Sequence, residues 1–193
     1  MLVTALEPRR KRLTALFLDG ELAAKLDSET LLQSGLRIGM ELDDEELYRL
    51  IQRSDAHRAQ EKALYLLEHR SHSKKELADK ISRTAGREAA ERAAERMEEL
   101  GLVNDAQYAR NLAEELLQRK RFAARRAEYE LLQKGIDRAL AQEIVEELAP
   151  EPEESLRFLL ERKYQRSLSD EKGRRRVFAA LPRLGYSGED IRT

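Results

Sequence analysis

This 193-residue chain has three histidines and no cysteine, and the spacing of its potentially catalytic residues does not group them into a recognisable site. The chain contains no cysteine, which excludes thiolate nucleophiles, disulfides and cysteine metal ligands. His69 and His72 stand on either side of an expected turn and His57 stands apart, so we expect solvated side chains rather than metal ligands. No glycine-rich phosphate-binding loop occurs. The sequence therefore predicts no catalytic residue, no metal, no cofactor and no enzymatic activity.

Acidic residues are concentrated in two short segments, residues 41–46 and 151–154. Carboxylates in such runs fit the first turn of a helix, where they stabilise the positive end of the helix dipole. We therefore interpret both segments as helix N-termini rather than as general acid–base pairs or metal sites.

Basic clusters are the strongest indication of a binding function. Several of them open expected helices, where positive charge opposes the helix dipole, and this unfavourable placement points to a role other than folding. Such charge can bind phosphate backbones or acidic protein surfaces. The candidate residues for binding a filament or a nucleic acid are Arg119, Lys120, Arg121, Arg125, Arg126, Arg162, Lys163, Arg166, Lys172, Arg174, Arg175 and Arg176.

A fifty-residue repeat must position these clusters. Three pairs of apolar residues, four apart and therefore on one helix face, recur at this period. The pairs are Leu77 with Ile81, Ala127 with Leu131, and Val177 with Leu181. A glycine follows each pair, and we expect each to end its helix in the left-handed conformation. These glycines are Gly86, Gly135 and Gly185.

Each repeat is expected to contain three helices. The predicted domains are an N-terminal segment of residues 1–54 and three repeats at residues 55–106, 107–150 and 151–193, the last with a truncated third helix. Repeats that stack only on their neighbours form an elongated array. The basic clusters before Ala127 and Val177 would then lie on the same side of this array.

The N-terminal segment carries a hairpin signal. Asp19-Gly20 separates two apolar runs, and this dipeptide favours a type I′ turn between strands at 13–18 and 21–26. Acidic residues then open a helix that we expect to run to Ile51 and to stop before a boundary near Ser54. The predicted fold class is mainly α, with tandem three-helix repeats behind a small segment that contains a β-hairpin.

Composition places the chain in a broad class. Charged residues make up 38% of it, and 36 Lys and Arg balance 37 Asp and Glu, as in helix-rich proteins with many surface ion pairs. No apolar run approaches the length of a membrane span, and the N-terminus lacks the layout of a signal peptide. Together with the missing cysteines, these features predict a cytoplasmic protein.

An alternative interpretation is a DNA-binding helix-turn-helix protein. Residues 73–78, the following helix and residues 101–103 resemble a helix-turn-helix core. The proposed recognition helix carries Arg87, Arg92 and Arg96 but also five glutamates, and a net-acidic helix suits a DNA groove badly. We therefore rank this alternative second.

The order of several motifs resembles the RecX regulatory proteins of bacteria over nearly the whole chain. The motifs are Asp19-Gly20-Glu21, Ser73-Lys74-Lys75-Glu76-Leu77, Gly101-Leu102-Val103-Asn104-Asp105, Tyr108-Ala109-Arg110, Glu130-Leu131 and Lys134-Gly135-Ile136. The chain departs from the family at Ala123 and Ala124, where a glycine is common, and in its short third repeat.

The resemblance implies a non-enzymatic modulator of RecA. It implies binding to RecA filaments on single-stranded DNA, with restraint of the recombinase, ATPase and co-protease activities. Regulation of DNA repair, homologous recombination and the SOS response would follow, and ATP would belong to the partner. We also expect weak direct DNA binding, a monomer and no contact with membranes.

Overall fold

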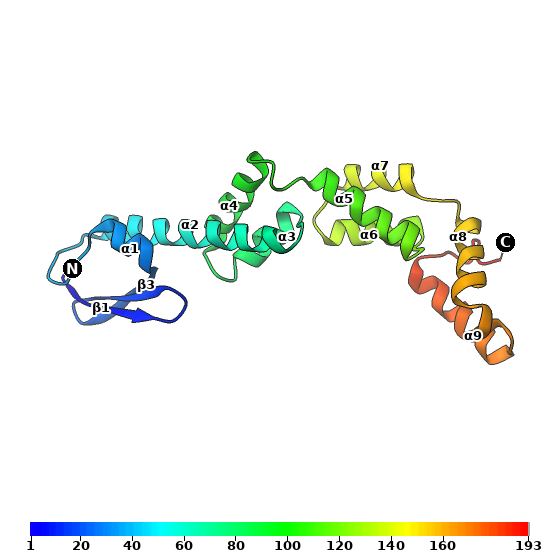
Figure 1. Ribbon diagram of the computed structural model, residues 1–193, viewed down its shortest axis with the longest axis horizontal. Coiled ribbons are helices and arrows are strands. Elements are labelled where there is room, and N and C mark those ends of the chain that lie inside the picture. Colours follow the sequence, from blue (N-terminus) through cyan, green and yellow to red (C-terminus); the bar gives the residue numbers. More distant parts are fainter. Residues whose placement is uncertain (193) are drawn as a thin grey trace. The chain divides into compact units, whose positions relative to one another are not determined.

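The computed structural model describes residues 1–192 and divides the chain into two compact units, Met1–Val103 and the remainder from Asn104 (Figure 1). The fold is mainly helical with an N-terminal three-stranded antiparallel sheet, which confirms the predicted fold class. The first unit joins the N-terminal segment and the first repeat. The second unit holds the second repeat and the shortened third one.

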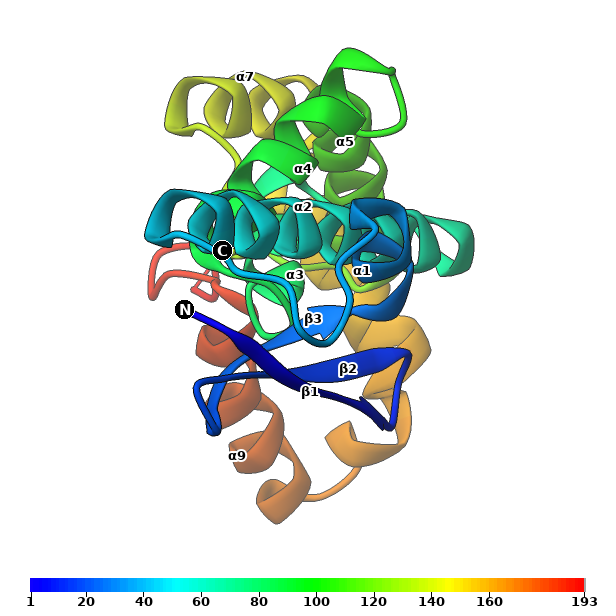
Figure 2. The same cartoon turned by 90° about the vertical axis from the view of Figure 1, so that its left-hand side faces the viewer.

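The sheet of the first unit consists of β1 (Val3–Arg9), β2 (Leu13–Leu18) and β3 (Glu21–Asp27), paired in that order. Asp19 and Gly20 connect β2 to β3 with φ of 50° and 90°, as a type I′ turn requires. The predicted hairpin is therefore confirmed. The sheet packs against the helices that follow it (Figure 2).

Helix α1 (Ser28–Ser34) is followed by α2 (Asp44–His69), a single helix of 26 residues. The helix end expected at Ile51 and the break expected near Ser54 are therefore wrong. No glycine or proline occurs within α2, so nothing in its sequence interrupts the helix at that point.

Ser54, where we expected the break, is instead a buried residue that ties α2 to the sheet. Its side chain is 1% exposed, and its Oγ accepts a hydrogen bond of 2.7 Å from the backbone N–H of Asp27 at the end of β3. Leu50 of α2 belongs to the core under the sheet, whereas Ala59 and Ala63 belong to the core of the first repeat. One helix thus contributes to both cores.

The first repeat is completed by α3 (Lys74–Ile81) and α4 (Arg87–Glu99), which pack on α2. The Oγ of Ser73 accepts a hydrogen bond from the N–H of Glu76, three residues further along the chain, and caps α3. Gly86 does not end α3. It is the N-cap of α4, with φ of −57°, because a longer turn follows α3 than follows the equivalent helices.

The second repeat contains α5 (Asp105–Glu114), the π-helical turn η1 (Glu115–Arg119), α6 (Ala124–Gln133) and α7 (Arg138–Leu148). Its core is formed mostly by small and aliphatic residues from all three helices. Gly135 ends α6 with φ of 82°, and this confirms the predicted C-terminal cap.

The third repeat contains α8 (Pro152–Phe158), the π-helical turn η2 (Leu159–Lys163) and the 3₁₀ turn η3 (Gln165–Leu168). It continues with α9 (Glu171–Ala180) and the 3₁₀ turn η4 (Leu181–Leu184). Residues 188–192 form only a turn, as expected for a truncated third helix.

The fifty-residue pattern marks equivalent core positions. All six residues of the repeated pairs are at most 4% exposed. Gly185 also takes a positive φ, of 97°, so two of the three glycines end their helices as expected. The repeat is therefore a repeat of packing as well as of sequence.

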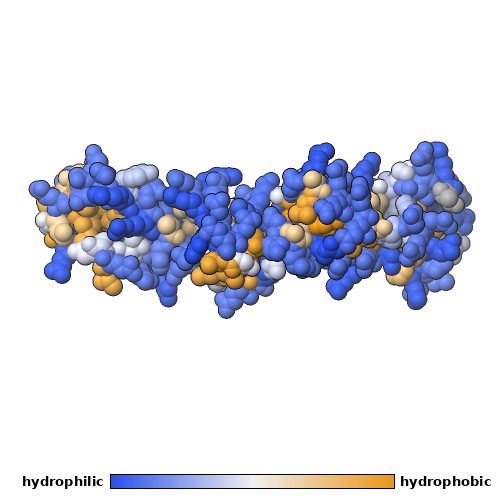
Figure 3. All heavy atoms as spheres, turned by 90° about the horizontal axis from the view of Figure 1, so that it is seen from above, coloured by the Kyte–Doolittle hydropathy of each residue, from blue (hydrophilic) through white to orange (hydrophobic). Residues whose placement is uncertain are grey.

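The face of the molecule in Figure 3 is mostly hydrophilic and is interrupted by separate hydrophobic patches. This surface matches the high content of charged residues. Within residues 1–192 no helix is both long enough and apolar enough to cross a membrane.

Candidate binding interface

A basic groove lies between the second and third repeats, inside the second unit. It has a volume of about 620 Å³ and brings together five of the predicted binding residues with two aromatic rings. The basic residues are Arg119, Lys120, Arg121, Arg162 and Lys163. Phe122 and Phe158 supply the rings. Sequence reasoning did not single out Phe158, although it precedes Arg162 by one helical turn.

Two π-helical turns position the basic residues of the groove. In η1 the N–H of Lys120 bonds to the carbonyl of Glu115, and in η2 the N–H of Tyr164 bonds to the carbonyl of Leu159, each at 3.0 Å. Such turns are frequent at functional sites. The basic residues of η1 and η2 lie in the last turn of their helices, where positive charge is favourable. The helix dipole therefore stabilises the positive charge of these residues, in contrast to basic residues at the start of a helix.

Arg121 joins the two repeats at the wall of the groove. Its guanidinium carbon lies 4.3 Å from the centre of the Phe158 ring, which is a cation–π contact. Its carbonyl accepts a hydrogen bond of 2.8 Å from the hydroxyl of Tyr186 in the third repeat. The side chain is only 18% exposed, and the backbone takes a left-handed φ of 54°. Arg121 therefore shapes the groove more than it offers free charge.

Three other basic residues of the groove offer charge to a ligand. Among residues 1–192, no acidic group lies within 4.0 Å of the side-chain nitrogens of Arg119, Arg162 or Lys163. Lys120 instead pairs with Glu115 at 2.8 Å, and this hydrogen bond lowers the pKa of the Glu115 carboxyl. The groove is thus positive, and its three unpaired cations suit phosphate or carboxylate groups.

The other predicted binding residues lie outside this groove. Arg125 and Arg126 are in the first turn of α6, and Arg126 pairs with Glu130 and lies 5.4 Å from the Tyr129 ring. The remaining candidates are Arg166 in η3 and Lys172, Arg174, Arg175 and Arg176 in α9. That the α6 and α9 clusters share one side of the repeats stays a prediction.

One group of potential metal ligands occurs among the described residues. Asp27, His57 and Glu61 place donor atoms within 4.8 Å of one another, a grouping that the sequence analysis missed because β3 and α2 are far apart in the chain. Each carboxylate already has a partner. Asp27 Oδ2 caps α1 by accepting from the N–H of Thr30 at 2.8 Å, and Glu61 pairs with Arg12 at 3.5 Å. Capping and ion pairing account for this cluster, so we assign no metal to it.

Helix α4, the recognition helix of the helix-turn-helix alternative, neutralises its own arginines. Each of them has a glutamate partner on the same helix, at 2.8 to 3.4 Å. The pairs are Arg87–Glu91, Arg92–Glu88 and Arg96–Glu99. This arrangement does not favour docking of α4 in a DNA groove.

Sequence comparisons relate the chain to proteins of one kind. A family model described as the second three-helix domain of RecX matches residues 104–144. A regulatory protein RecX of Caldanaerobacter subterraneus subsp. tengcongensis is 31% identical over 167 residues, which cover 84% of this chain and 84% of the relative. A regulatory protein RecX of Streptomyces lividans is 37% identical over 128 residues, which cover 64% of this chain and 68% of the relative.

Solved structures share the fold. A crystal structure of a regulatory protein RecX superposes with a TM-score of 0.63 at 19% identity and covers all of this chain and 97% of its own. A second, RecX from Lactobacillus salivarius, gives a TM-score of 0.56 at 21% identity and covers 72% of this chain and 93% of its own.

Proposed function

The chain belongs to the RecX family of regulatory proteins, and from this membership we propose that it binds RecA filaments on single-stranded DNA. Binding restrains the recombinase, ATPase and co-protease activities of the filament and so regulates DNA repair and recombination in the cytoplasm. ATP is bound and hydrolysed by the partner. This chain acts through binding alone.

The basic groove between the second and third repeats is the observation that supports this proposal. Its three unpaired cations surround two aromatic side chains in a concave surface of about 620 Å³. Phosphates of the bound DNA strand, or carboxylates of the recombinase, are ligands of matching charge. The aromatic rings can also stack on exposed bases of a single strand.

Restraint of the filament follows if one chain contacts more than one protomer. The second unit offers the basic groove, and the first unit has a separate folded core with its own surface. Two weak contacts on linked modules bind far more tightly than either contact alone. Bridging of adjacent protomers would oppose the changes in filament pitch that growth and turnover need.

The ATPase rate of RecA on single-stranded DNA tests the proposal. The chain is titrated well below one copy per protomer, and binding to preformed filaments is measured in parallel. We expect the rate to fall at these low ratios. An unchanged rate together with no binding to filaments would overturn the proposal.

Charge reversal tests which surface binds. We expect the triple variant Arg119→Glu, Arg162→Glu, Lys163→Glu to weaken filament binding by at least about tenfold, because three charge contacts become repulsive. The matched control is Arg10→Glu, Arg37→Glu, Arg83→Glu, which changes the net charge equally but alters exposed residues outside the groove. Equal loss in both variants would show that only net charge matters.

The α6 and α9 clusters need a separate variant. We expect reversal of Arg125, Arg126, Arg174, Arg175 and Arg176 to glutamate to abolish filament binding with an unchanged helical circular dichroism spectrum. Unaltered binding would remove these clusters from the proposed interface. Binding of each variant to single-stranded DNA without RecA separates direct DNA contacts from protein contacts.

A further inference from the structure

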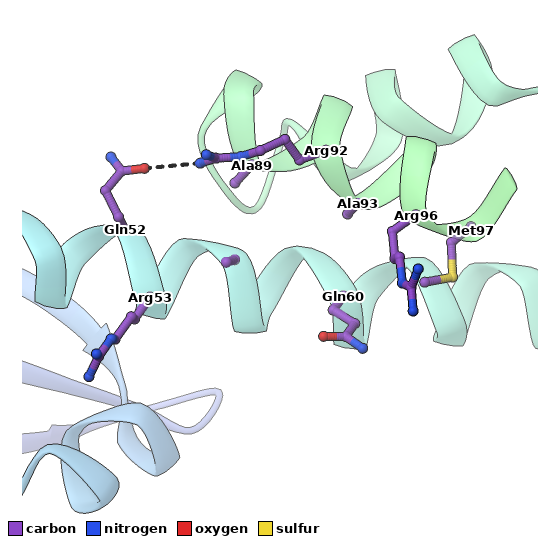
Figure 4. Close-up of a pocket in the computed structure, with 9 residues that line it drawn as sticks. Gln52, Arg53, Gln60, Ala89, Arg92, Ala93, Arg96 and Met97 are labelled. Atoms are coloured by element: carbon purple, nitrogen blue, oxygen red, sulfur yellow. Dashed lines mark hydrogen bonds between the residues drawn. The ribbon is translucent and has the colours of Figure 1, made fainter. Parts of the chain in front are cut away.

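A second groove lies on the first unit, between α2 and α4 (Figure 4). It has a volume of about 430 Å³ and is lined only by residues of these two helices. Helix α2 contributes Gln52, Arg53, Ala56 and Gln60, and α4 contributes Ala89, Arg92, Ala93, Arg96 and Met97. None of these residues belongs to the basic groove of the second unit.

The floor of the α2–α4 groove is apolar and made of small side chains. Ala89, Ala93 and Met97 recur at intervals of four residues along α4, and Ala56 faces them from α2. Eight residues of helix extend about 12 Å, so the groove has the length of roughly two helical turns. Alanines on its floor allow the backbone of another helix to approach closely, as small residues do where helices pack.

All charged residues that line the α2–α4 groove are arginines. Arg53 has no ion pair within 4.0 Å among residues 1–192. The Arg92 guanidinium donates to Gln52 Oε1 at 3.2 Å across the groove (Figure 4) and lies 3.4 Å from Glu88 Oε1. Arg96 is likewise paired with Glu99, at 2.8 Å. Exposed pairs of this kind contribute little to stability, so carboxylates of a ligand can replace them at low cost.

We propose that the α2–α4 groove docks an acidic amphipathic helix of a partner protein. The apolar stripe of that helix would lie on the alanine floor, and carboxylates at its flanks would pair with Arg53, Arg92 and Arg96. The apolar floor favours a protein segment over a nucleic acid, and the arginine rim selects an acidic segment over a basic one. This contact goes beyond the proposed function, because it assigns a binding role to the first unit whatever protein carries the helix.

Fluorescence anisotropy with a designed probe tests the docking site without any recombinase. The probe is a labelled helical peptide of about 15 residues, with alanine and leucine on one face and glutamate on its flanks. A second peptide carries lysine in place of every glutamate. We expect the full chain to bind the acidic peptide with a dissociation constant below about 1 mM and the basic peptide at least about tenfold more weakly. Failure to bind the acidic peptide, or equal binding of both, would overturn the inference.

Two variants separate the groove from general charge effects. Reversal of Arg53, Arg92 and Arg96 to glutamate should weaken binding of the acidic peptide by at least about tenfold. Ala56→Phe leaves the charge intact and fills the groove from an exposed position of α2, so it should also weaken binding. The matched control Arg10→Glu, Arg37→Glu, Arg83→Glu should bind like the unaltered chain. Loss of binding in that control, or normal binding by Ala56→Phe, would contradict docking in the groove.

Discussion

His72, which we expected to be a solvated side chain, is instead buried inside the first repeat, with 3% of the residue exposed. Burial lowers its pKa below the ordinary value of 6.5, although a hydrogen bond with Glu76 acts in the opposite direction. The folded chain therefore holds the imidazole neutral at a pH where the unfolded chain already binds a proton. The contribution of His72 to the free energy of unfolding is therefore complete above the pKa that His72 has in the unfolded chain, and it is lost as the pH falls below that value.

We expect the melting temperature to fall as the pH is lowered from about 7.5 to about 5.5. In the His72→Gln variant we expect it to fall less steeply over the same range. Thermal unfolding followed by circular dichroism across this range measures the slope. His69→Gln is the control, because His69 is exposed at the end of α2. Equal slopes for His72→Gln and the unaltered chain would exclude His72 as the source.

Gly185 is a residue of the second unit at which packing leaves no room for a side chain. A Cβ at this position would lie 2.5 Å from Arg126 Cβ, and φ is 97°. We expect Gly185→Ala to lower the free energy of unfolding by about 2 to 4 kcal/mol through overlap and backbone strain. Urea unfolding measures the loss, with Gly188→Ala as the control because open space surrounds that glycine. Equal stability of the two variants would contradict this packing.

At the scale of single elements, α2 depends on a hydrogen bond that no local sequence pattern reveals. Ser54 accepts the N–H of Asp27, and both residues are almost fully buried. Ser54→Ala leaves that donor without its partner, so we expect a loss of about 1 to 3 kcal/mol in unfolding free energy. Chemical denaturation measures the loss, and Ser71→Ala, at an exposed position, should change it little. A Ser54→Ala variant as stable as the control would mean that water replaces the lost partner.

Elements governed by local chemistry could be predicted from the sequence. The Asp19-Gly20 turn, the Ser73 cap and the Gly135 helix end each depend on one or two neighbouring residues. Gly86 was misplaced because a glycine can also serve as an N-cap, and the length of the preceding turn decides between these roles. The helix end at Ile51 was wrong because the continuity of α2 depends on packing against two cores.

The candidate site could be predicted only in part. The sequence identified the basic clusters but not which of them meet, because the groove forms where the chain returns from the third repeat to the second. A hydrogen bond of 2.9 Å from the N–H of Ala123 to the carbonyl of Leu184 marks that return. No sequence motif marks the π-helical turns η1 and η2, which position the basic residues.

At the scale of the whole molecule, the chain consists of two units with separate cores. We expect fragments 1–103 and 104–193 each to unfold cooperatively, because each contains the residues that its own cores need. Calorimetry of each fragment and of the full chain measures this. A fragment without a cooperative transition would show that its fold requires the other unit.

Helix α2 also has a mechanical consequence. At 1.5 Å per residue, the 26 residues of α2 form a helix about 39 Å long. This helix is bound to the sheet through Ser54, and Ala59 lies in the core of the first repeat. We therefore expect the sheet and the first repeat to move together as one rigid body. Spin labels at Tyr48 and Glu68 should keep one separation whether the chain is free or bound, so any adjustment of the chain to its partner has to occur elsewhere.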